Sequence, residues 1–364
     1  MAQNHLIGKF VPPRFERSML DLSDIEQSFG QQLAYAANGR SALYRILSGG
    51  PGWKKILLPV YLCATVLIPL RKLGIEPVFY DIDPADLNPD LSSLLYMAEK
   101  HNASVALFPS LYGNAANLAQ AEIRLKERDI FLIDDAAQSL GATLDGRQVG
   151  SFGDAGFFSV GPGKPLAGHM GAFFWTTGTL VSASTHHDLL HRIKWIDYWL
   201  RRVHAYNTQS IPFFHKGLEI ATILVAKLAD ESLDDIAPFE VEIIGGLLQA
   251  LRDGAFAFRQ RQADTFARRF GSSDRFRVVA PLRGKPSSHK IVLHFASASA
   301  ALVFRSYAGE RKIYTGDGYP LLSTNLAELP EAARIDGQIV ELPIEDDGTK
   351  MEYMFDVVQK FIDS

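Results

Sequence analysis

FLIDDAAQ (131–138) and AGFFSVGPGKPL (155–166) are the two stretches that decide the fold of this chain. Each carries a short run, at 131–137 and 156–160, that is rich in apolar residues and does not alternate strictly with polar ones. Such runs are typical of strands covered on both faces, as in a parallel α/β sheet. Similar runs occur at 56–60, 77–82, 104–109 and 171–176. The sequence therefore predicts a doubly wound or related open sheet within the first 180 residues.

Lys164 lies just beyond the run at 156–160, among glycines and prolines that disfavour a helix. Ligands of such sheets collect beyond the carboxyl ends of the strands, although a lone lysine is most often simply exposed. A nucleotide-binding P-loop, GxxxxGK[ST], needs a glycine where this chain has Phe158 and a serine or threonine where it has Pro165. The sequence excludes that motif and leaves Lys164 as a candidate for other chemistry.

Two carboxylates, Asp134 and Asp135, end the run at 131–137. Carboxylates are costly to desolvate, so this pair must be wetted by a crevice, bound to a metal or paired with a cation. Asp134 alternatively caps the following turn. For Asp135 we favour a functional role.

A third candidate is the segment ANGRSAL (37–43), which precedes apolar positions at helical spacing. A small-residue turn leading into a helix offers backbone N–H groups and the positive end of the helix dipole, which suit a phosphate. The alternative is that Ser41 is only the N-cap of the helix.

The length of 364 residues predicts two unequal domains, because a single core stops growing at about 250 to 300 residues. We expect a large domain at 1–250, with a helical insertion around 188–228, and a small α+β domain at 251–364. A long helical pattern at 239–270 joins them. In the small domain, strand-like runs occur at 290–295, 301–304 and 338–342, and a closing helix is expected at 351–361.

The bulk composition lowers the odds of several partners. A formal net charge of −4 supplies no field that gathers nucleic acid or anionic lipid. The apolar segment at 220–228 is far shorter than the roughly 20 residues needed to span a bilayer, so membrane contact is not expected. Cys63 is the single cysteine, which excludes an intramolecular disulfide and a four-thiolate zinc site. We expect no metal site and a cytoplasmic location.

Taken together, NGRSAL (38–43), the long stretch at 132–166 and Leu111-Tyr112-Gly113 resemble the DegT/DnrJ/StrS-type sugar aminotransferases. The resemblance covers roughly residues 35–350 and is strongest at 131–166. It implies an aspartate-aminotransferase-like α/β fold (fold type I), with a large, mostly parallel-sheet domain and a smaller C-terminal α+β domain. It also implies a pyridoxal 5'-phosphate (PLP) cofactor, amino transfer from glutamate to a keto sugar that is nucleotide-linked, and a homodimer.

The resemblance assigns roles residue by residue. Lys164 matches the lysine that carries the cofactor and transfers protons, and Asp135 matches the aspartate that pairs with the pyridine nitrogen. Gln138 matches the polar residue near the ring hydroxyl. The phosphate site corresponds to Ser159, through its hydroxyl, and to Gly39 and Arg40, through their amides.

The chain also departs from the family. Cys63 stands where many members stack an aromatic ring on the cofactor, so it is either part of the cofactor site or a small buried hydrophobe. Ser110 replaces a common histidine. The usual Asn-x-Arg stretch reads DIAPFE at 235–240. An inactive or regulatory relative is therefore one alternative. Another is a different PLP reaction such as dehydration, but dehydrating relatives commonly have histidine at the position of Lys164.

Overall fold

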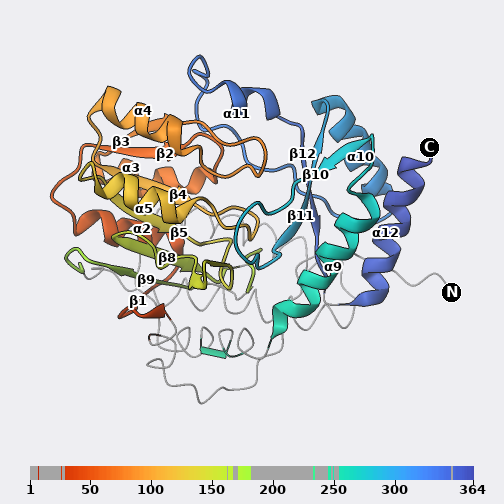
Figure 1. Ribbon diagram of the computed structural model, residues 1–364, viewed down its shortest axis with the longest axis horizontal. Helices are drawn as coiled ribbons and strands as arrows, with labels where there is room; N and C mark the ends of the chain where they lie inside the picture. The colour runs from red at the N-terminus through yellow and green to blue at the C-terminus, as the bar shows by residue number, and fades with distance from the viewer. Residues whose placement is uncertain are drawn as a thin grey trace, which may run out of the picture.

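The computed structural model describes most of the chain, namely residues 29–161, 163–166, 171–181, 254–345 and 347–364, together with Ile7, Glu26, Leu233, Gly245, Gly246 and Gln249. We call the elements between residues 34 and 176 the large domain and those between 255 and 364 the small domain (Figure 1). The predicted boundary near residue 250 stays a prediction. The expected helices around 188–228 and the DIAPFE segment lie outside the described residues.

A seven-stranded sheet forms the centre of the described large domain, in the spatial order β1-β9-β8-β5-β4-β2-β3. Its strands are β1 (Ala34–Ala36), β2 (Lys55–Pro59), β3 (Glu76–Tyr80), β4 (Val105–Pro109), β5 (Phe131–Asp135), β8 (Ala155–Ser159) and β9 (Ala172–Thr176). All pairings from β3 to β8 are parallel. The β9 strand is antiparallel to β8, and β1 is antiparallel to β9. The predicted mostly parallel sheet is confirmed.

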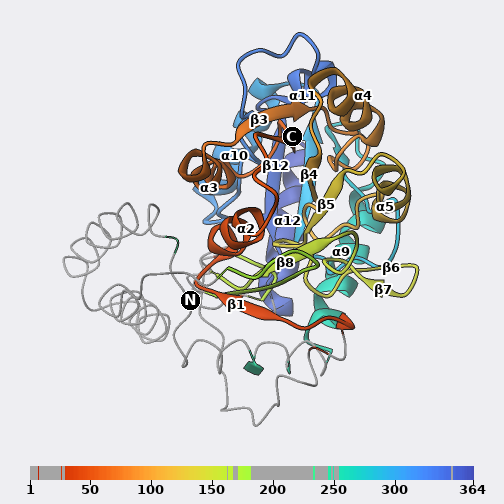
Figure 2. The same cartoon turned by 90° about the vertical axis from the view of Figure 1, so that its left-hand side faces the viewer.

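Helices cover both faces of this sheet, as Figure 2 shows. On one face lie α2 (Gly39–Ser48) and α3 (Leu67–Leu73), after the short 3-10 turn η1 (Ala64–Val66), and on the other lie α4 (Leu91–His101) and α5 (Leu118–Lys126). Because side chains alternate along a strand, Leu132 packs on the α4 and α5 side while Ile133 packs on the α2 side. A hairpin of β6 (Thr143–Leu144) and β7 (Arg147–Gln148) follows β5.

The small domain is an antiparallel sheet with helices packed on it. Its elements are α9 (Ala255–Phe270), β10 (Phe276–Val278), β11 (Lys290–Phe295), α10 (Ala298–Glu310), α11 (Pro330–Ile335), β12 (Ile339–Pro343) and α12 (Gly348–Ile362). The core is rich in aromatic rings from α9, β11, α10 and α12. The predicted small α+β domain is confirmed as a fold. Within the predicted helical pattern at 239–270, Gly245, Gly246 and Gln249 are helical, and helix α9 begins at Ala255, after Gly254 with φ +80°.

One strand prediction was wrong. Residues 301–304 lie inside helix α10, not in a strand. Ser297 caps this helix by accepting a hydrogen bond from the Ala300 N–H at 3.2 Å. Ala301 and Phe304 are buried, whereas Leu302 and Val303 are 59% and 60% exposed. The apolar run is therefore partly a solvent-facing helix surface, and short apolar runs do not distinguish strand from helix.

Two buried aspartates attach the small domain to the large one. Asp81, at the end of β3, accepts hydrogen bonds from the Glu331 and Ala332 N–H groups at 2.9 and 2.8 Å, which caps the start of α11. Asp86 forms an ion pair with Arg283 at 3.0 Å. Among the described residues, no helix is long and apolar enough to cross a membrane.

Candidate active site

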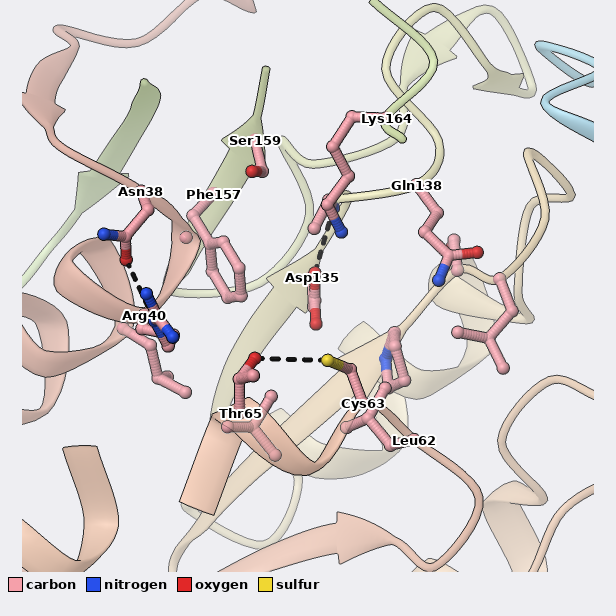
Figure 3. Close-up of a pocket in the computed structure, with 17 residues that line it drawn as sticks. Asn38, Arg40, Leu62, Cys63, Thr65, Asp135, Gln138, Phe157, Ser159 and Lys164 are labelled. Atoms are coloured by element: carbon pink, nitrogen blue, oxygen red, sulfur yellow. Dashed lines mark hydrogen bonds between the residues drawn. The ribbon is translucent and has the colours of Figure 1, made fainter. Parts of the chain in front are cut away.

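A cavity of about 200 Å³ opens at the carboxyl ends of β4, β5 and β8, on the side covered by α2. Figure 3 shows the side chains that face it. The seven residues singled out from the sequence all line this cavity: Gly39, Arg40, Cys63, Asp135, Gln138, Ser159 and Lys164. They come from four separate segments of the chain, so the fold brings together what the sequence separates.

Asp134 and Asp135 point to opposite sides of β5. Asp135 lies in the cavity, and its Oδ1 accepts the Ala137 N–H at 2.9 Å. Asp134 lies on the other side, where its Oδ2 accepts the N–H groups of Gly150 and Phe152 at 2.6 and 3.1 Å. Asp134 thus holds a turn that is distant in sequence and does not cap the turn after its own strand. Only Asp135 is placed for chemistry in the cavity.

Lys164 reaches into the cavity toward Asp135 (Figure 3). Burial raises the pKa of Asp135 to about 6, while the Ala137 N–H and the Lys164 charge pull it down. Burial lowers the pKa of Lys164, and the Asp135 charge opposes that shift. The two groups therefore stabilise each other's charged form inside a site that disfavours both charges.

The first turn of α2 borders the cavity next to the end of β8. Asn38, rather than Ser41, is the N-cap, because its side chain accepts the Ser41 N–H at 3.1 Å. A Cβ added at Gly39 would lie 3.6 Å from the Ser159 Cβ. The N-terminal N–H groups of a helix carry a partial positive charge, so this helix end and the Ser159 hydroxyl together form a cradle for an anion.

Gln138 is held at both ends of its side-chain amide. Its Oε1 accepts the Tyr112 N–H at 2.8 Å, and its Nε2 donates to the Tyr319 hydroxyl. The hydroxyls of Tyr61 and Tyr112 are 2.6 Å apart, and the Tyr61 and Tyr319 rings meet edge to face at 5.7 Å. This tyrosine cluster beside the cavity was not predicted. Tyr112 belongs to a stretch quoted for the family resemblance, whereas no sequence signal marks Tyr319.

Cys63 lines the cavity as a partly buried thiol, with its Sγ 3.1 Å from the Thr65 Oγ1. Ser110, at the end of β4, also lines the cavity, and its hydroxyl accepts the Ala116 N–H at 3.0 Å. Neither residue supplies a ring. This part of the wall therefore offers small polar groups instead of an aromatic stack.

The small domain contributes charged groups near Lys164 that sequence reasoning missed. Lys290, at the start of β11, forms an ion pair with the buried Glu341 of β12. Both act electrostatically on Lys164. His289 precedes Lys290, and the backbone of Gly163, the residue before Lys164, acts on the pKa of its ring. The residues around 289 and 341 form no sequence pattern that would place them near Lys164.

Residues 14–186 match the model of the DegT/DnrJ/EryC1/StrS aminotransferase family. This matched region of the chain belongs to that family. Members of the DegT/DnrJ/EryC1/StrS family are PLP enzymes. The matched region contains all the large-domain elements that line the cavity.

One relative matched by sequence is named as a sugar aminotransferase. The UDP-2-acetamido-2-deoxy-3-oxo-D-glucuronate aminotransferase of Pseudomonas aeruginosa is 32% identical over 152 residues, which cover 40% of this chain and 42% of that protein. The aligned region spans less than half the length of the relatives matched by sequence.

Solved structures resemble the whole chain more broadly. A family aminotransferase from Brucella abortus superimposes with a TM-score of 0.68 at 19% identity, over 94% of this chain and 89% of that one. The GDP-4-keto-6-deoxy-D-mannose-3-dehydratase of E. coli, with bound hydrated PLP, gives a TM-score of 0.66 at 19% identity, over 92% and 90%. These likenesses show the aspartate-aminotransferase-like fold.

The donor set of the cavity fits PLP. A carboxylate (Asp135) suits a protonated ring nitrogen, a lysine amine with a lowered pKa (Lys164) suits an aldehyde, and the cradle of the α2 end and Ser159 suits a phosphate. Within the described part of the chain, no three His, Cys, Asp or Glu side chains are grouped to hold a metal ion.

Proposed function

We propose that this protein is a PLP-dependent aminotransferase that moves an amino group from glutamate to a keto sugar, nucleotide-linked, for polysaccharide or secondary-metabolite biosynthesis. The observation that carries the proposal is the convergence of Lys164, Asp135 and the anion cradle on one cavity. When bound, PLP would supply an electron sink for the carbon that bears the amino group.

Each residue of the cavity has a distinct task in this proposal. Asp135 keeps a proton on the ring nitrogen, because a buried carboxylate beside it favours the charged form. Gly39, Arg40 and Ser159 bind the phosphate. Gln138 orients the cofactor ring by contacting the hydroxyl group of that ring. Cys63 packs against the cofactor as a small side chain, in place of the aromatic ring of many relatives.

Lys164 has two tasks. Burial lowers the pKa of its amine, so a larger fraction is the neutral, nucleophilic form that attaches the cofactor. The same Nζ, once released, takes a proton from the substrate carbon and returns it.

Substrate class and assembly are inferred from the relatives. The Pseudomonas aeruginosa relative is named for a nucleotide keto sugar, which supports a keto-sugar acceptor here. A homodimer with each cofactor near the subunit boundary is part of the proposal. Sedimentation at micromolar concentration tests the dimer, and a monomer alone would contradict it.

Dehydration is the second candidate, because relatives of this chain include GDP-4-keto-6-deoxy-D-mannose 3-dehydratases. Lys164 argues against it, because dehydrating relatives commonly have histidine at this position, whereas transamination uses a lysine that attaches the cofactor between turnovers and releases it during the reaction. Product analysis with a nucleotide keto sugar separates the two. An amino sugar supports the proposal, and a deoxygenated keto sugar supports the second candidate.

The decisive experiment locates the cofactor. Protein incubated with PLP is reduced with borohydride, digested and analysed by mass spectrometry. We expect a pyridoxyl adduct on Lys164 and none in Lys164→Ala, which should remain folded. An adduct on Lys290 or any other lysine would overturn the assignment. Glutamate should then discharge the yellow absorbance of the unreduced protein, and an unchanged spectrum would favour a regulatory relative.

A further inference from the structure

The loop that carries Lys164 is contacted on both sides of the lysine by the small domain. Before it, the His289 ring lies close enough to the Gly163 backbone for that backbone to act on the ring's pKa. After it, the Arg259 guanidinium donates to the Pro165 carbonyl oxygen through Nη1 at 2.7 Å. Gly163 has φ +75°, a backbone conformation that costs little only for glycine. These contacts therefore act on a turn whose backbone conformation sets the position of the Lys164 Cα and the direction of its side chain.

Both contacting residues are themselves fixed. Arg259 lies in the second turn of α9, with its guanidinium 5.6 Å from the centre of the Phe256 ring. His289 lies directly before β11, and its backbone is pressed against Gly113, where an added Cβ would meet the His289 nitrogen at 2.8 Å. Ser287 reinforces this contact by donating its N–H to the Gly113 carbonyl at 3.0 Å. The small domain thus contacts the lysine loop from two rigid elements.

The charges around His289 favour a neutral ring. Burial lowers its pKa well below the ordinary value, and the charges of Lys290, Lys164 and Arg259 lower it further. A neutral imidazole still hydrogen-bonds a backbone group. It does so without placing a further positive charge beside Lys164.

We infer that Arg259 and His289 are positioning residues that hold the backbone on both sides of Lys164 and keep its amine directed into the cavity. This inference rests on the proposed function for its consequence, which is efficient capture of PLP by Lys164. It implies that the packing of the small domain on the large domain controls how the Lys164 amine is directed and how fast it attaches PLP. Neither residue touches the reacting atoms.

The contact itself is tested in the cofactor-free protein by hydrogen exchange. Arg259→Ala and His289→Leu should each speed exchange of the backbone around Lys164 by about tenfold, the effect of losing one hydrogen bond that holds a loop. The thermal unfolding midpoint should stay near that of the wild type. Arg259→Lys and His289→Asn, which retain a side-chain N–H donor, should restore part of the protection.

Matched controls come from the same elements. Arg261→Ala changes a neighbour on α9 whose guanidinium lies over the Phe258 ring. His294→Leu changes the far part of β11, where the ring hydrogen-bonds the Gln338 side chain. Neither control should change exchange around Lys164. Equal exchange in Arg259→Ala, His289→Leu and the wild type would overturn the inference, whatever the cofactor does.

The consequence is tested by borohydride trapping at timed intervals after PLP is added. Arg259→Ala and His289→Leu should attach PLP to Lys164 about tenfold more slowly than the wild type, and the two controls at the wild-type rate. Equal attachment rates in all five proteins would overturn the positioning role. If wild-type Lys164 takes up no PLP, the proposed function fails, and the exchange measurement still decides whether the small domain holds the loop.

Discussion

The side-chain amide of Gln138 donates a hydrogen bond to the phenol of Tyr319, which joins the cavity of the large domain to a segment between α10 and α11. Burial raises the pKa of Tyr319 well above its ordinary value, and the nearby Glu341 raises it further. Tyr319 therefore stays protonated at neutral pH. Its hydroxyl accepts from Gln138, whose other end is fixed by the Tyr112 N–H.

Tyr319→Phe should weaken PLP binding by about threefold to tenfold, because the mutation removes one hydrogen bond that orients Gln138. Absorbance titration of the cofactor-free protein gives the dissociation constant. Tyr314→Phe is the matched control, since Tyr314 is 56% exposed, and it should bind PLP as the wild type does. Equal affinity in both variants would contradict the role given to Gln138.

Asp135→Asn should reduce turnover on the order of 100-fold or more, because the neutral amide cannot keep a proton on the cofactor nitrogen. The pyridoxyl adduct on Lys164 should still form, since attachment does not require that carboxylate. Steady-state kinetics with glutamate and a keto sugar measure the loss. Asp134→Asn is the control, and a larger loss of turnover in that variant than in Asp135→Asn would refute the assignment of the two carboxylates.

The contribution of Asp134 to the free energy of unfolding of the cofactor-free protein should fall as pH rises. Burial raises the pKa of Asp134 to about 8 in the folded protein, against about 3.9 in an unfolded chain. Between these values the folded state holds a proton that the unfolded state has lost, so this group's contribution to stability falls as pH increases, by at most about 1.4 kcal/mol per pH unit.

Denaturant unfolding at pH 5.0 and pH 7.5 measures this effect. The free energy of unfolding should fall less between the two pH values in Asp134→Asn than in the wild type. Asp336→Asn, a change at an exposed aspartate, should keep the wild-type difference. If the free energy of unfolding of Asp134→Asn falls between pH 5.0 and pH 7.5 as much as that of the wild type, Asp134 is already ionised in the folded protein.

PLP should protect Cys63 from alkylation. Because Cys63 is the only cysteine, the mass increase after iodoacetamide treatment reports on this one thiol, which lines the cavity. At a PLP concentration ten times the dissociation constant, mass action predicts about tenfold slower labelling. Pyridoxal without the phosphate should protect less at equal concentration. Identical labelling with and without PLP would place the cofactor elsewhere.

The sequence by itself determined the sheet and the large-domain side of the cavity. Each strand is a local apolar run, and the ends of β5 and β8 place Asp135, Ser159 and Lys164 at one sheet edge because parallel strands share their direction. Strand alternation also separates Asp134 from Asp135. Of the seven cavity residues, Asp135 and Ser159 end such strands, whereas Gly39, Arg40, Cys63 and Gln138 were assigned from the family resemblance.

Only the tertiary structure decided what closes that cavity from the other side. Tyr319, His289 and Arg259 lie about 95 to 180 residues from the groups they contact, and their own neighbours in sequence carry no pattern for those contacts. The error at 301–304 has the same origin, because burial of Phe304 and exposure of Leu302 depend on the surface against which α10 packs. Local sequence sets the period of an element, whereas the packing of α9 and β11 on the large domain sets which side chains meet Lys164.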